Sequence, residues 1–413
     1  MRDTVDVIVI GGGIIGMSAA LQIAQRSNLR VLVVDKGSGP GEGSTGASSA
    51  VCRFRYTRPE TVQLASNGIA AYQNWGEFLG CGSPLARYQQ IGVLWLSNDR
   101  QQAEQDAFRL TSLGISVDAI DDAEVADRFP AISTCGIPPD LVNGSPHVCT
   151  NGGNLHLLEH TGGYMDPSDA LQDLIDAARN LHVDLSFRTE VADIDISGGA
   201  VRGVRFKDGR TVACETVILS AGPWSSRLLD RVGLAGRWPL EPTRIQIAHI
   251  DRPLSVGGDL PVCVDMAGGI YFRPQNRGQQ IIIGSIREED ELETVSDAND
   301  FARFADDEFI REKVHALSHR LRFSELKGSV RGYSGLYTMN RKDMHPIVGR
   351  TPINGLMVAC GFSGHGFKLA PAIGSLLARA VTKNRSPFDT TVDDSFLSFD
   401  RNPIKLPSLN VLA

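Results

Sequence analysis

The stretch VDVIVIGGGIIGMSAALQIAQRSNLRVLVVD, residues 5–35, decides the fold of this chain. It opens with a run rich in β-branched residues, Val5 to Ile10, which is typical of a strand buried on both faces of a parallel sheet. A glycine-rich turn and an apolar segment with helical spacing follow, and a second buried strand then ends at Asp35. The sequence therefore predicts a βαβ unit.

The glycines between the two strands predict a dinucleotide site. Gly11, Gly13 and Gly16 occupy the glycine places of the GxGxxG pattern, and Asp35 follows 19 residues after the last of them. The first glycine allows a tight turn, the second lets a pyrophosphate approach the backbone, and the third lets helix and strand pack closely. The helix N-terminus favours the diphosphate, and the acid accepts the ribose hydroxyls. Residues 41–46 also match GxGxxG, but no strand precedes them, so we interpret them as a flexible loop.

The composition is that of a globular protein with room for two domains. Of 413 residues, 42% are hydrophobic and 22% are charged, and the net charge is −7. Lys and Arg are scattered, which argues against a nucleic-acid partner. Asp3 and Asp6 interrupt any signal-peptide pattern, and the glycines of the N-terminal run fit a strand, turn and helix better than a membrane span. We expect a cytoplasmic protein with no transmembrane segment.

The seven cysteines indicate neither a disulfide framework nor a zinc cluster, because their number is odd and no CxxC occurs. His147 and Cys149 are close enough in sequence to suggest metal ligands. No second pair of ligands accompanies them, so we expect no metal.

The rest of the chain alternates between helical and strand patterns. The sequence predicts a helix over residues 166–180 capped by Asp166 or Ser168, strands and a hairpin over 185–219, antiparallel strands over 240–290 and a helix within 298–322. Near the C-terminus, a strand over 355–359 leads into GFSGHGFKLAP, residues 361–371, and an apolar helix is expected over 372–381. A second helix N-terminus is thus directed at the ligand of the first.

Four stretches together resemble a known family, the FAD-dependent amino acid and amine oxidoreductases that include sarcosine oxidase, glycine oxidase and D-amino acid oxidase. They are residues 5–35, STGASSAVCRFRYTRPETVQLA (44–65), VILSAGPWS (217–225) and GFSGHGFKLAPAIG (361–374), in family order along nearly the whole chain. The sarcosine oxidase and glycine oxidase type is the most similar. The resemblance implies an α/β fold, with a discontinuous Rossmann-like FAD-binding domain and a substrate domain built on a mostly antiparallel sheet.

The resemblance also implies domain ranges and the residues that hold FAD. The FAD-binding domain would comprise residues 1–88, 160–238 and 328–390, the substrate domain 89–159 and 239–327, and a C-terminal tail 391–413. The expected cofactor-binding residues are Gly11, Gly13, Ile14, Ile15, Gly16, Asp35, Lys36, Ser44, Thr45, Ser48, Ser49, Val191, Ala221, Gly222, Trp224, Gly335, Gly361, Gly364, His365, Gly366, Phe367 and Lys368. In this family the flavin ring lies against the C-terminal glycine loop.

The same resemblance assigns roles in the substrate site. A lysine and an arginine bind the substrate's carboxylate in sarcosine oxidases, and Lys368 and Arg53 fill those places here, with Arg55 as the rival to Arg53. Internal ion pairs of these cations are the alternative. Tyr271 and Tyr337 match aromatic positions of the substrate cavity, although ordinary sheet tyrosines fit equally well. His365 is either a contact of the cofactor or a satisfied loop histidine.

Three positions depart from the sarcosine oxidase pattern. Gly335 stands where flavin is attached through cysteine, so we expect non-covalent FAD. Ile282 stands where the family's oxygen-activating lysine falls, which favours a dehydrogenase over a fast oxidase. Ile286 replaces a histidine, which changes the polarity of the site.

The function that these expectations favour is oxidation of the C–N bond of a small amino acid or N-alkyl amino acid. The product would be an imine, formed by hydride transfer to N5 of FAD. The partners would be a carboxylate-bearing amine and an unidentified electron acceptor or subunit. Two alternatives stay open: oxidation of a 2-hydroxy acid, and a flavin-bearing subunit or assembly factor of a larger complex.

Overall fold

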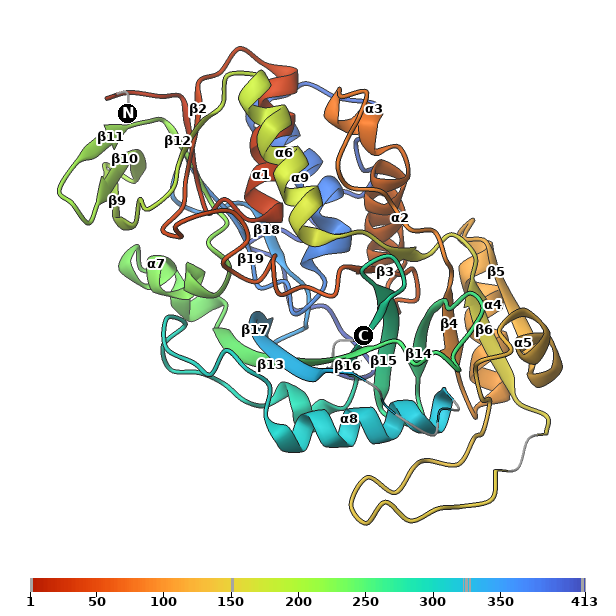
Figure 1. Cartoon of the computed structure of the whole chain (residues 1–413). Coiled ribbons are helices and arrows are strands. Elements are labelled where there is room, and N and C mark those ends of the chain that lie inside the picture. Colours follow the sequence, from red (N-terminus) through yellow and green to blue (C-terminus); the bar gives the residue numbers. More distant parts are fainter. Residues whose placement is uncertain are drawn as a thin grey trace.

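The computed structural model describes residues 3–149, 152–321, 323, 326, 328–409 and 412. Two large sheets with helices packed against them organise the described chain (Figure 1). The predicted α/β class is confirmed, because one sheet is mainly parallel and the other mainly antiparallel.

The first sheet has six strands in the order β18–β19–β12–β1–β2–β8. The bounds are β1 (Val7–Ile10), β2 (Val31–Val34), β8 (Asp184–Ser186), β12 (Thr216–Leu219), β18 (Ile347–Arg350) and β19 (Leu356–Cys360). Neighbours are parallel except β18 and β19. Strand β1 lies between two partners and all its residues are buried, which explains the apolar run in its sequence.

Helices cover one face of this sheet and a small sheet covers the other (Figure 1). The helices are α1 (Ile14–Arg26), α6 (Pro167–Asn180) and α9 (Gly366–Thr382), and the small sheet consists of β9 (Val191–Ser197), β10 (Ala200–Phe206) and β11 (Thr211–Ala213). Asp166 caps α6, since its carboxylate accepts the N–H groups of Ser168 and Asp169. This cap was one of the two that the sequence offered.

The second sheet has eight strands in the order β17–β13–β16–β15–β14–β4–β6–β5. They are β4 (Val93–Leu96), β5 (Val117–Asp121), β6 (Leu155–Glu159), β13 (Leu240–Asp251), β14 (Val262–Asp265), β15 (Ile270–Gln275), β16 (Gln280–Ser285) and β17 (Val330–Asn340). Only the β14–β4 pair is parallel. Strand β17 falls in the range expected for the FAD-binding domain but pairs with β13 here, and the domain division itself stays a prediction.

Helix α8 (Asp307–Arg320) packs along one face of the second sheet, at the bottom of Figure 1. The opposite face, which carries Tyr271, is turned towards the core of the first sheet and its helices. A cofactor held at the end of the first sheet would therefore lie against the second.

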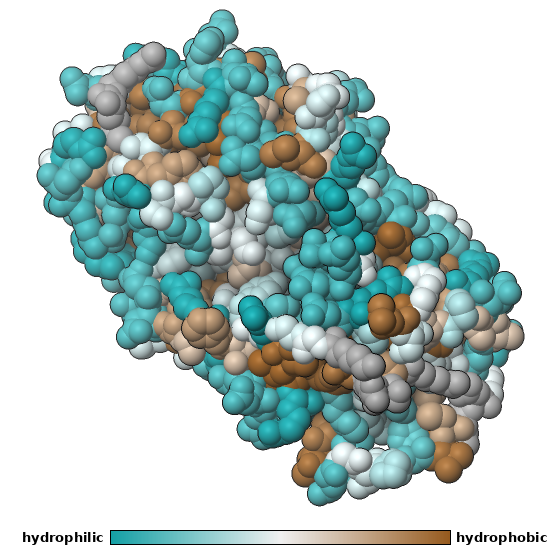
Figure 2. Space-filling view, in the orientation of Figure 1, coloured by the Kyte–Doolittle hydropathy of each residue, from teal (hydrophilic) through white to brown (hydrophobic). Residues whose placement is uncertain are grey.

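The remaining elements connect these layers. The helices are α2 (Pro59–Gln73), α3 (Trp75–Leu79), α4 (Arg100–Ser112), α5 (Asp122–Arg128) and α7 (Ser225–Arg231), the short strands are β3 (Val51–Cys52) and β7 (Gly163–Tyr164), and single 3-10 turns span Gly222–Trp224, Ala235–Arg237 and Glu288–Glu291. Among the residues described, no helix has the length and apolar character to cross a membrane. Hydrophilic residues cover most of the face in Figure 2, and apolar ones form small separate patches.

Helix α9 begins at Gly366, so the prediction that it begins at Ala372 was wrong. The sequence suggested a start after Pro371 because proline has no N–H to donate to the carbonyl of Phe367, one helical turn earlier. The Tyr72 hydroxyl donates to that carbonyl instead, at 2.7 Å. A side chain from α2 thus makes a proline tolerable inside the helix.

The C-terminal stretch packs against the body of the molecule. Leu397 and Phe399 are 1% and 2% exposed, and the Trp238 indole donates to the Phe399 carbonyl at 2.7 Å. Two buried apolar side chains therefore attach this irregular stretch to the rest of the protein.

Candidate active site

A cavity of about 670 Å³ lies where the C-terminal ends of the parallel strands meet the second sheet. Most of the expected cofactor residues line it: Gly11, Gly13, Ile14, Ile15, Asp35, Lys36, Ser44, Thr45, Ser48, Val191, Ala221, Gly222, Trp224, Gly364, Gly366 and Phe367. Gly16, Ser49, Gly361, His365 and Lys368 lie outside this lining. Gly335 lines a smaller neighbouring cavity of about 210 Å³.

The N-terminal wall is shaped by glycines that cannot be replaced without collision. Gly11 has φ +108°, and a Cβ there would lie 2.4 Å from the Ser220 carbonyl oxygen. A Cβ on Gly16 would lie 2.0 Å from the Gly11 carbonyl oxygen, so strand and helix touch at this point. These contacts leave backbone, rather than side chains, at the start of α1, which is the surface that a diphosphate requires.

Asp35 fixes the loops at the end of β2. Its carboxylate accepts the N–H groups of Gly12 and Gly37, each at 2.7 Å, while the residue still lines the cavity. Thr45 accepts the Ile14 N–H at 3.1 Å. Together the glycine backbone, the helix N-terminus and a carboxylate fit the diphosphate and ribose of a dinucleotide.

The glycines of the C-terminal loop have reasons within the protein itself. Gly361 and Gly364 have φ of +72° and +84°, and Cβ atoms there would lie 2.8 Å from Leu240 and 2.6 Å from the Tyr337 ring. A Cβ on Gly366 would meet nothing closer than Phe362, at 3.5 Å. Backbone conformation and packing thus account for two glycines that the sequence attributed to the flavin alone.

Buried cations gather next to this loop. Arg53 is 5% exposed and its guanidinium lies over the Tyr56 ring, 4.2 Å from the centroid. Lys368, in the first turn of α9, is 7% exposed. Burial, reinforced by the nearby charge of Arg53, lowers the pKa of Lys368 to about 7. Within the described chain, no carboxylate oxygen lies within ion-pair distance of the Lys368 amine. The structure therefore brings together the two cations that the sequence paired.

Arg55, the rival to Arg53, has a structural partner. Its Nε donates to Asp106 at 2.7 Å, and Asp106 also pairs with Arg109. Glu159, fully buried, accepts the backbone N–H groups of Phe54 and Arg55, each at 2.8 Å. Glu159 thus holds the backbone next to Arg53 in place.

His365 presents one nitrogen without a partner. Its Nδ1 lies 3.1 Å from the Tyr56 hydroxyl, while its Nε2 is buried and finds no hydrogen-bond partner in the described structure. Burial, together with the charges of Lys368 and Arg53, lowers its pKa well below the usual value, so the ring is neutral. A buried orphan nitrogen of this kind is suited to a bound ligand.

Two tyrosines and an arginine extend the site onto the second sheet. Tyr337 lines the large cavity, whereas Tyr271 stacks its ring over Gly284 on the neighbouring strand. Arg273 is 2% exposed and donates to the carbonyl oxygens of Ser49 and Pro274 at 2.6 and 2.9 Å. It lies opposite Ile282, so both side chains occupy the same sheet face. Sequence reasoning passed over Arg273, although it stands two residues from Tyr271.

Residues before α8 reach the opposite end of the cavity. The helix begins at Asp307, within the range 298–322 in which the sequence predicted a helix, and Asn299 and Arg303 line the cavity from the irregular segment before it. The Asn299 side chain accepts from Lys36 and from the Trp224 indole, the latter at 2.9 Å. Lys36 also lies 3.9 Å from the Trp224 ring centroid. No sequence signal marked Asn299, because its partners Lys36 and Trp224 are 263 and 75 residues away in the sequence.

Comparisons with known proteins agree with this geometry. The chain matches the family model for FAD dependent oxidoreductases over residues 6–380. FAD-dependent oxidoreductase domain-containing protein 1 of Xenopus laevis is 26% identical over 411 residues, which cover 91% of this chain and 79% of that protein. Sarcosine oxidase subunit beta of Rhodobacter capsulatus is 24% identical over 387 residues, with coverage of 92% and 86%.

Among solved structures, L-proline dehydrogenase from P. horikoshii is similar in fold. It has a TM-score of 0.80 at 22% identity, with 97% of this chain and 98% of that chain covered. Since the family model spans most of the sequence, and the cavity offers a glycine backbone and a carboxylate where a dinucleotide needs them, this chain belongs to the family of FAD-dependent oxidoreductases and is an enzyme that uses FAD.

Proposed function

We propose that this enzyme oxidises the C–N bond of a small amino acid or N-alkyl amino acid, with Lys368 and Arg53 binding the substrate's carboxylate. The observation that carries the proposal is the position of the Lys368 amine, which is buried next to the buried Arg53. Burial and the charge of Arg53 lower its pKa to about 7. A carboxylate that enters there restores the charge of the amine and forms charge-assisted hydrogen bonds. The names of two relatives, a sarcosine oxidase subunit and an L-proline dehydrogenase, add support, because both substrates are N-alkyl amino acids.

The cofactor residues proposed are those named from the sequence, and we propose that FAD is bound without a covalent bond. No cysteine occurs among the described residues that line the large cavity, and Gly335 faces Ala47, whose Cβ would lie 2.5 Å from a Cβ placed there. Bound FAD would supply the two-electron acceptor for the substrate's C–N bond. Denaturation in acid should release all the flavin into the supernatant, whereas flavin retained by the precipitated chain would show covalent attachment.

The chain's own residues orient the substrate and exclude water. Tyr271 and Tyr337 are buried enough that their pKa values are raised, the first less than the second, so both stay protonated donors. Neutral His365 offers its Nε2 to the bound ligand. The substrate nitrogen must be uncharged, because its lone pair supports the developing imine, and the two cations of the site disfavour a protonated amine beside them.

We propose that an acceptor other than oxygen takes the electrons. Ile282 is fully buried at the place where an oxygen-activating lysine would stand, and it offers no charge. A fast oxidase is the second candidate, because Arg273 lies opposite Ile282 as a buried cation. Mixing the reduced enzyme with oxygen separates the two: slow reoxidation that Ile282→Lys accelerates supports the dehydrogenase, and fast reoxidation that Arg273→Gln slows supports the oxidase.

The experiment that tests the substrate class is anaerobic bleaching of the flavin. The purified chain is mixed with sarcosine, proline, other N-methyl amino acids, simple secondary amines and 2-hydroxy acids. Bleaching by amino acids, but not by amines that lack a carboxylate, supports the proposal. Bleaching by 2-hydroxy acids alone would replace it with the second reaction class, which needs a base for the hydroxyl proton.

No bleaching with any compound would favour a flavin-bearing subunit or assembly factor. One relative is named as a subunit, which supports this alternative, in which the chain works with a partner protein. The cytoplasmic location expected from the sequence stays a prediction, which cell fractionation tests.

A further inference from the structure

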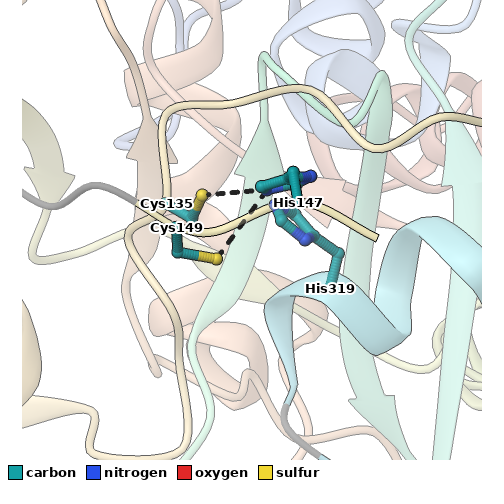
Figure 3. Close-up of side chains that lie close together, drawn as sticks. All are labelled: Cys135, His147, Cys149 and His319. Atoms are coloured by element: carbon teal, nitrogen blue, oxygen red, sulfur yellow. Dashed lines mark hydrogen bonds between the residues drawn. The ribbon is translucent and has the colours of Figure 1, made fainter. Parts of the chain in front are cut away.

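Four metal-binding side chains meet far from the cofactor cavity. Cys135, His147 and Cys149 come from the long loop after α5, and His319 comes from the last turn of α8 (Figure 3). One ligand atom from each lies within 4.8 Å of the others. We call these four residues the Cys135 cluster. None of them lines the large cavity, so the FAD site does not explain their arrangement.

The distances within the Cys135 cluster match those of a tetrahedral metal site. Zinc bonds of about 2.3 Å to sulfur and 2.0 Å to nitrogen would separate sulfur from nitrogen by about 3.5 Å in a tetrahedron. His147 Nε2 lies 3.3 Å from Cys135 Sγ and 3.8 Å from Cys149 Sγ, on either side of that value. The imidazole thus directs one nitrogen between two sulfurs, as Figure 3 shows.

The second histidine is oriented by a hydrogen bond that suits a metal ligand. His319 Nε2 lies 3.1 Å from the Ile137 carbonyl oxygen, which can only accept, so Nε2 carries the proton. Its Nδ1 is then left with a free lone pair. Metal-binding histidines characteristically donate their other N–H to a carbonyl or carboxylate in this way. The His147 and His319 rings lie edge to face, with centroids 4.6 Å apart.

A buried ion pair holds Cys135 next to His319. Arg320 donates to Asp265 at 2.5 and 2.6 Å, and its Nη1 donates to the carbonyl oxygens of Ser133 and Cys135 at 3.0 and 2.5 Å. The Ser133 N–H returns a bond to the Arg320 carbonyl at 2.8 Å. The residue that precedes Arg320 is His319, so two of the four ligands are fixed before any ion binds.

We propose that the Cys135 cluster binds one zinc ion and so fastens the loop of residues 136–149 to the end of α8. Two sulfurs and two imidazoles form the donor set of structural zinc sites, and the absence of a carboxylate among these four residues disfavours magnesium or calcium. Four protein ligands close the site, which indicates a structural rather than catalytic ion. Binding would release the thiol protons of Cys135 and Cys149 to solvent.

The proposal departs from the expectation that this chain binds no metal. That expectation rested on His147 and Cys149 having no second pair of ligands in the sequence. Cys135 and His319 are that pair, and they lie 12 and 172 residues away from His147.

The test measures metal content in the whole flavoprotein, purified without chelators after growth with zinc. Elemental mass spectrometry should find about one zinc ion per chain. Protein produced with cobalt in place of zinc should show the intense visible absorption of a tetrahedral cobalt ion. Cys149→Ser, at an exposed position, should lose the ion, while the matched control Cys81→Ser, at another exposed cysteine, should retain it. Removal of zinc from the wild type should speed proteolysis within residues 138–146 by about tenfold or more.

Three results would overturn the proposal. They are a wild-type protein with no zinc, zinc retained equally by Cys149→Ser and Cys81→Ser, and a Cys135–Cys149 disulfide found by peptide mapping of the native protein. The flavin absorbance per chain, recorded on the same samples, reports on the FAD site alone, so the outcome is independent of the proposed reaction.

Discussion

Two buried lysines show how one residue type serves two purposes in this molecule. Lys313, on α8 beneath the second sheet, is 0% exposed and its amine lies 2.6 Å from Asp290 and 3.7 Å from Glu312. Lys368, on α9 beside the cofactor cavity, is 7% exposed and has a pKa lowered to about 7 by burial and by Arg53. One cation is compensated by the protein and the other is left in a place where its charge is costly.

The difference between the two lysines separates a charge that stabilises the fold from a charge that is available to a ligand. A buried charge with its carboxylate partner belongs to the structure, and removal of one partner exposes the cost of burying the other. A buried charge held beside a second cation is stabilised when an anion arrives. The buried Lys368 amine beside Arg53 therefore supports the proposed ligand site, whereas the ion pair of Lys313 stabilises the fold.

The largest expected effect comes from Lys368→Met. Loss of the charge-assisted contact to a substrate carboxylate should lower kcat/KM by about 100-fold to 1,000-fold, equivalent to about 3–4 kcal/mol. Stability should stay the same or rise, because the variant removes a charge that is costly to bury. Steady-state kinetics with an artificial acceptor, and unfolding in urea, check the two halves. A variant with full activity would remove Lys368 from the carboxylate site.

The matched control, Lys313→Met, should show the reverse pattern. It leaves Asp290 without its cation and Glu312 with Arg287 alone, and because the side chains of Asp290 and Glu312 are 25% and 27% exposed, we expect a loss of about 2–3 kcal/mol rather than more. Turnover at low temperature should remain within about twofold of the wild type. If both lysine variants lost activity equally while both kept their stability, the contrast between support and ligand site would be wrong.

The smallest of the three effects is a dependence on pH. In the enzyme without a bound carboxylate, the Lys368 amine is mainly protonated below pH 7 and mainly neutral above it. The Kd of a simple carboxylate such as acetate should be flat below pH 7 and then rise about tenfold per pH unit, until binding by Arg53 alone is reached. Calorimetric titration from pH 6 to 9 measures this rise.

The same lowered pKa predicts how stability changes with pH. Because the folded pKa of Lys368 lies below the unfolded one, the unfolded chain holds more protons in between, and this residue's contribution to stability rises from pH 7 towards the unfolded pKa. In Lys368→Met both pH dependences should vanish. A Kd that kept its slope in that variant would assign the titration to another group.

The dinucleotide site was predictable because the sequence patterns that indicate it follow one another directly along the chain. Strand, glycine turn, helix and acid follow one another within residues 5–35, and the geometry of βαβ units then fixes their arrangement. The antiparallel second sheet was predictable for a similar reason, since alternating runs reveal strands. Its one parallel pair, β14 with β4, was not, because pairing between distant strands leaves no local mark.

Errors arose where a distant side chain altered a local rule. The start of α9 was placed too late because a proline such as Pro371 usually ends a helix, whereas here the Tyr72 hydroxyl donates to the carbonyl that the proline leaves unpaired. Arg273 escaped attention because its importance comes from burial opposite Ile282. The glycines of the C-terminal loop were attributed to the flavin, whereas Tyr337 and Leu240 already forbid side chains at Gly364 and Gly361.

The sequence by itself determined the class of fold and the dinucleotide site, since each is carried by a short pattern whose chemistry is local. The pair Arg53 and Lys368 was suggested by the family resemblance and stays a prediction. Only the tertiary structure decided that Arg55 belongs to Asp106, that Lys368 has a lowered pKa, and that Cys135 and His319 join His147 and Cys149. The physical reason is that burial and the proximity of charges or ligands arise from packing between remote segments, which no single stretch of sequence contains.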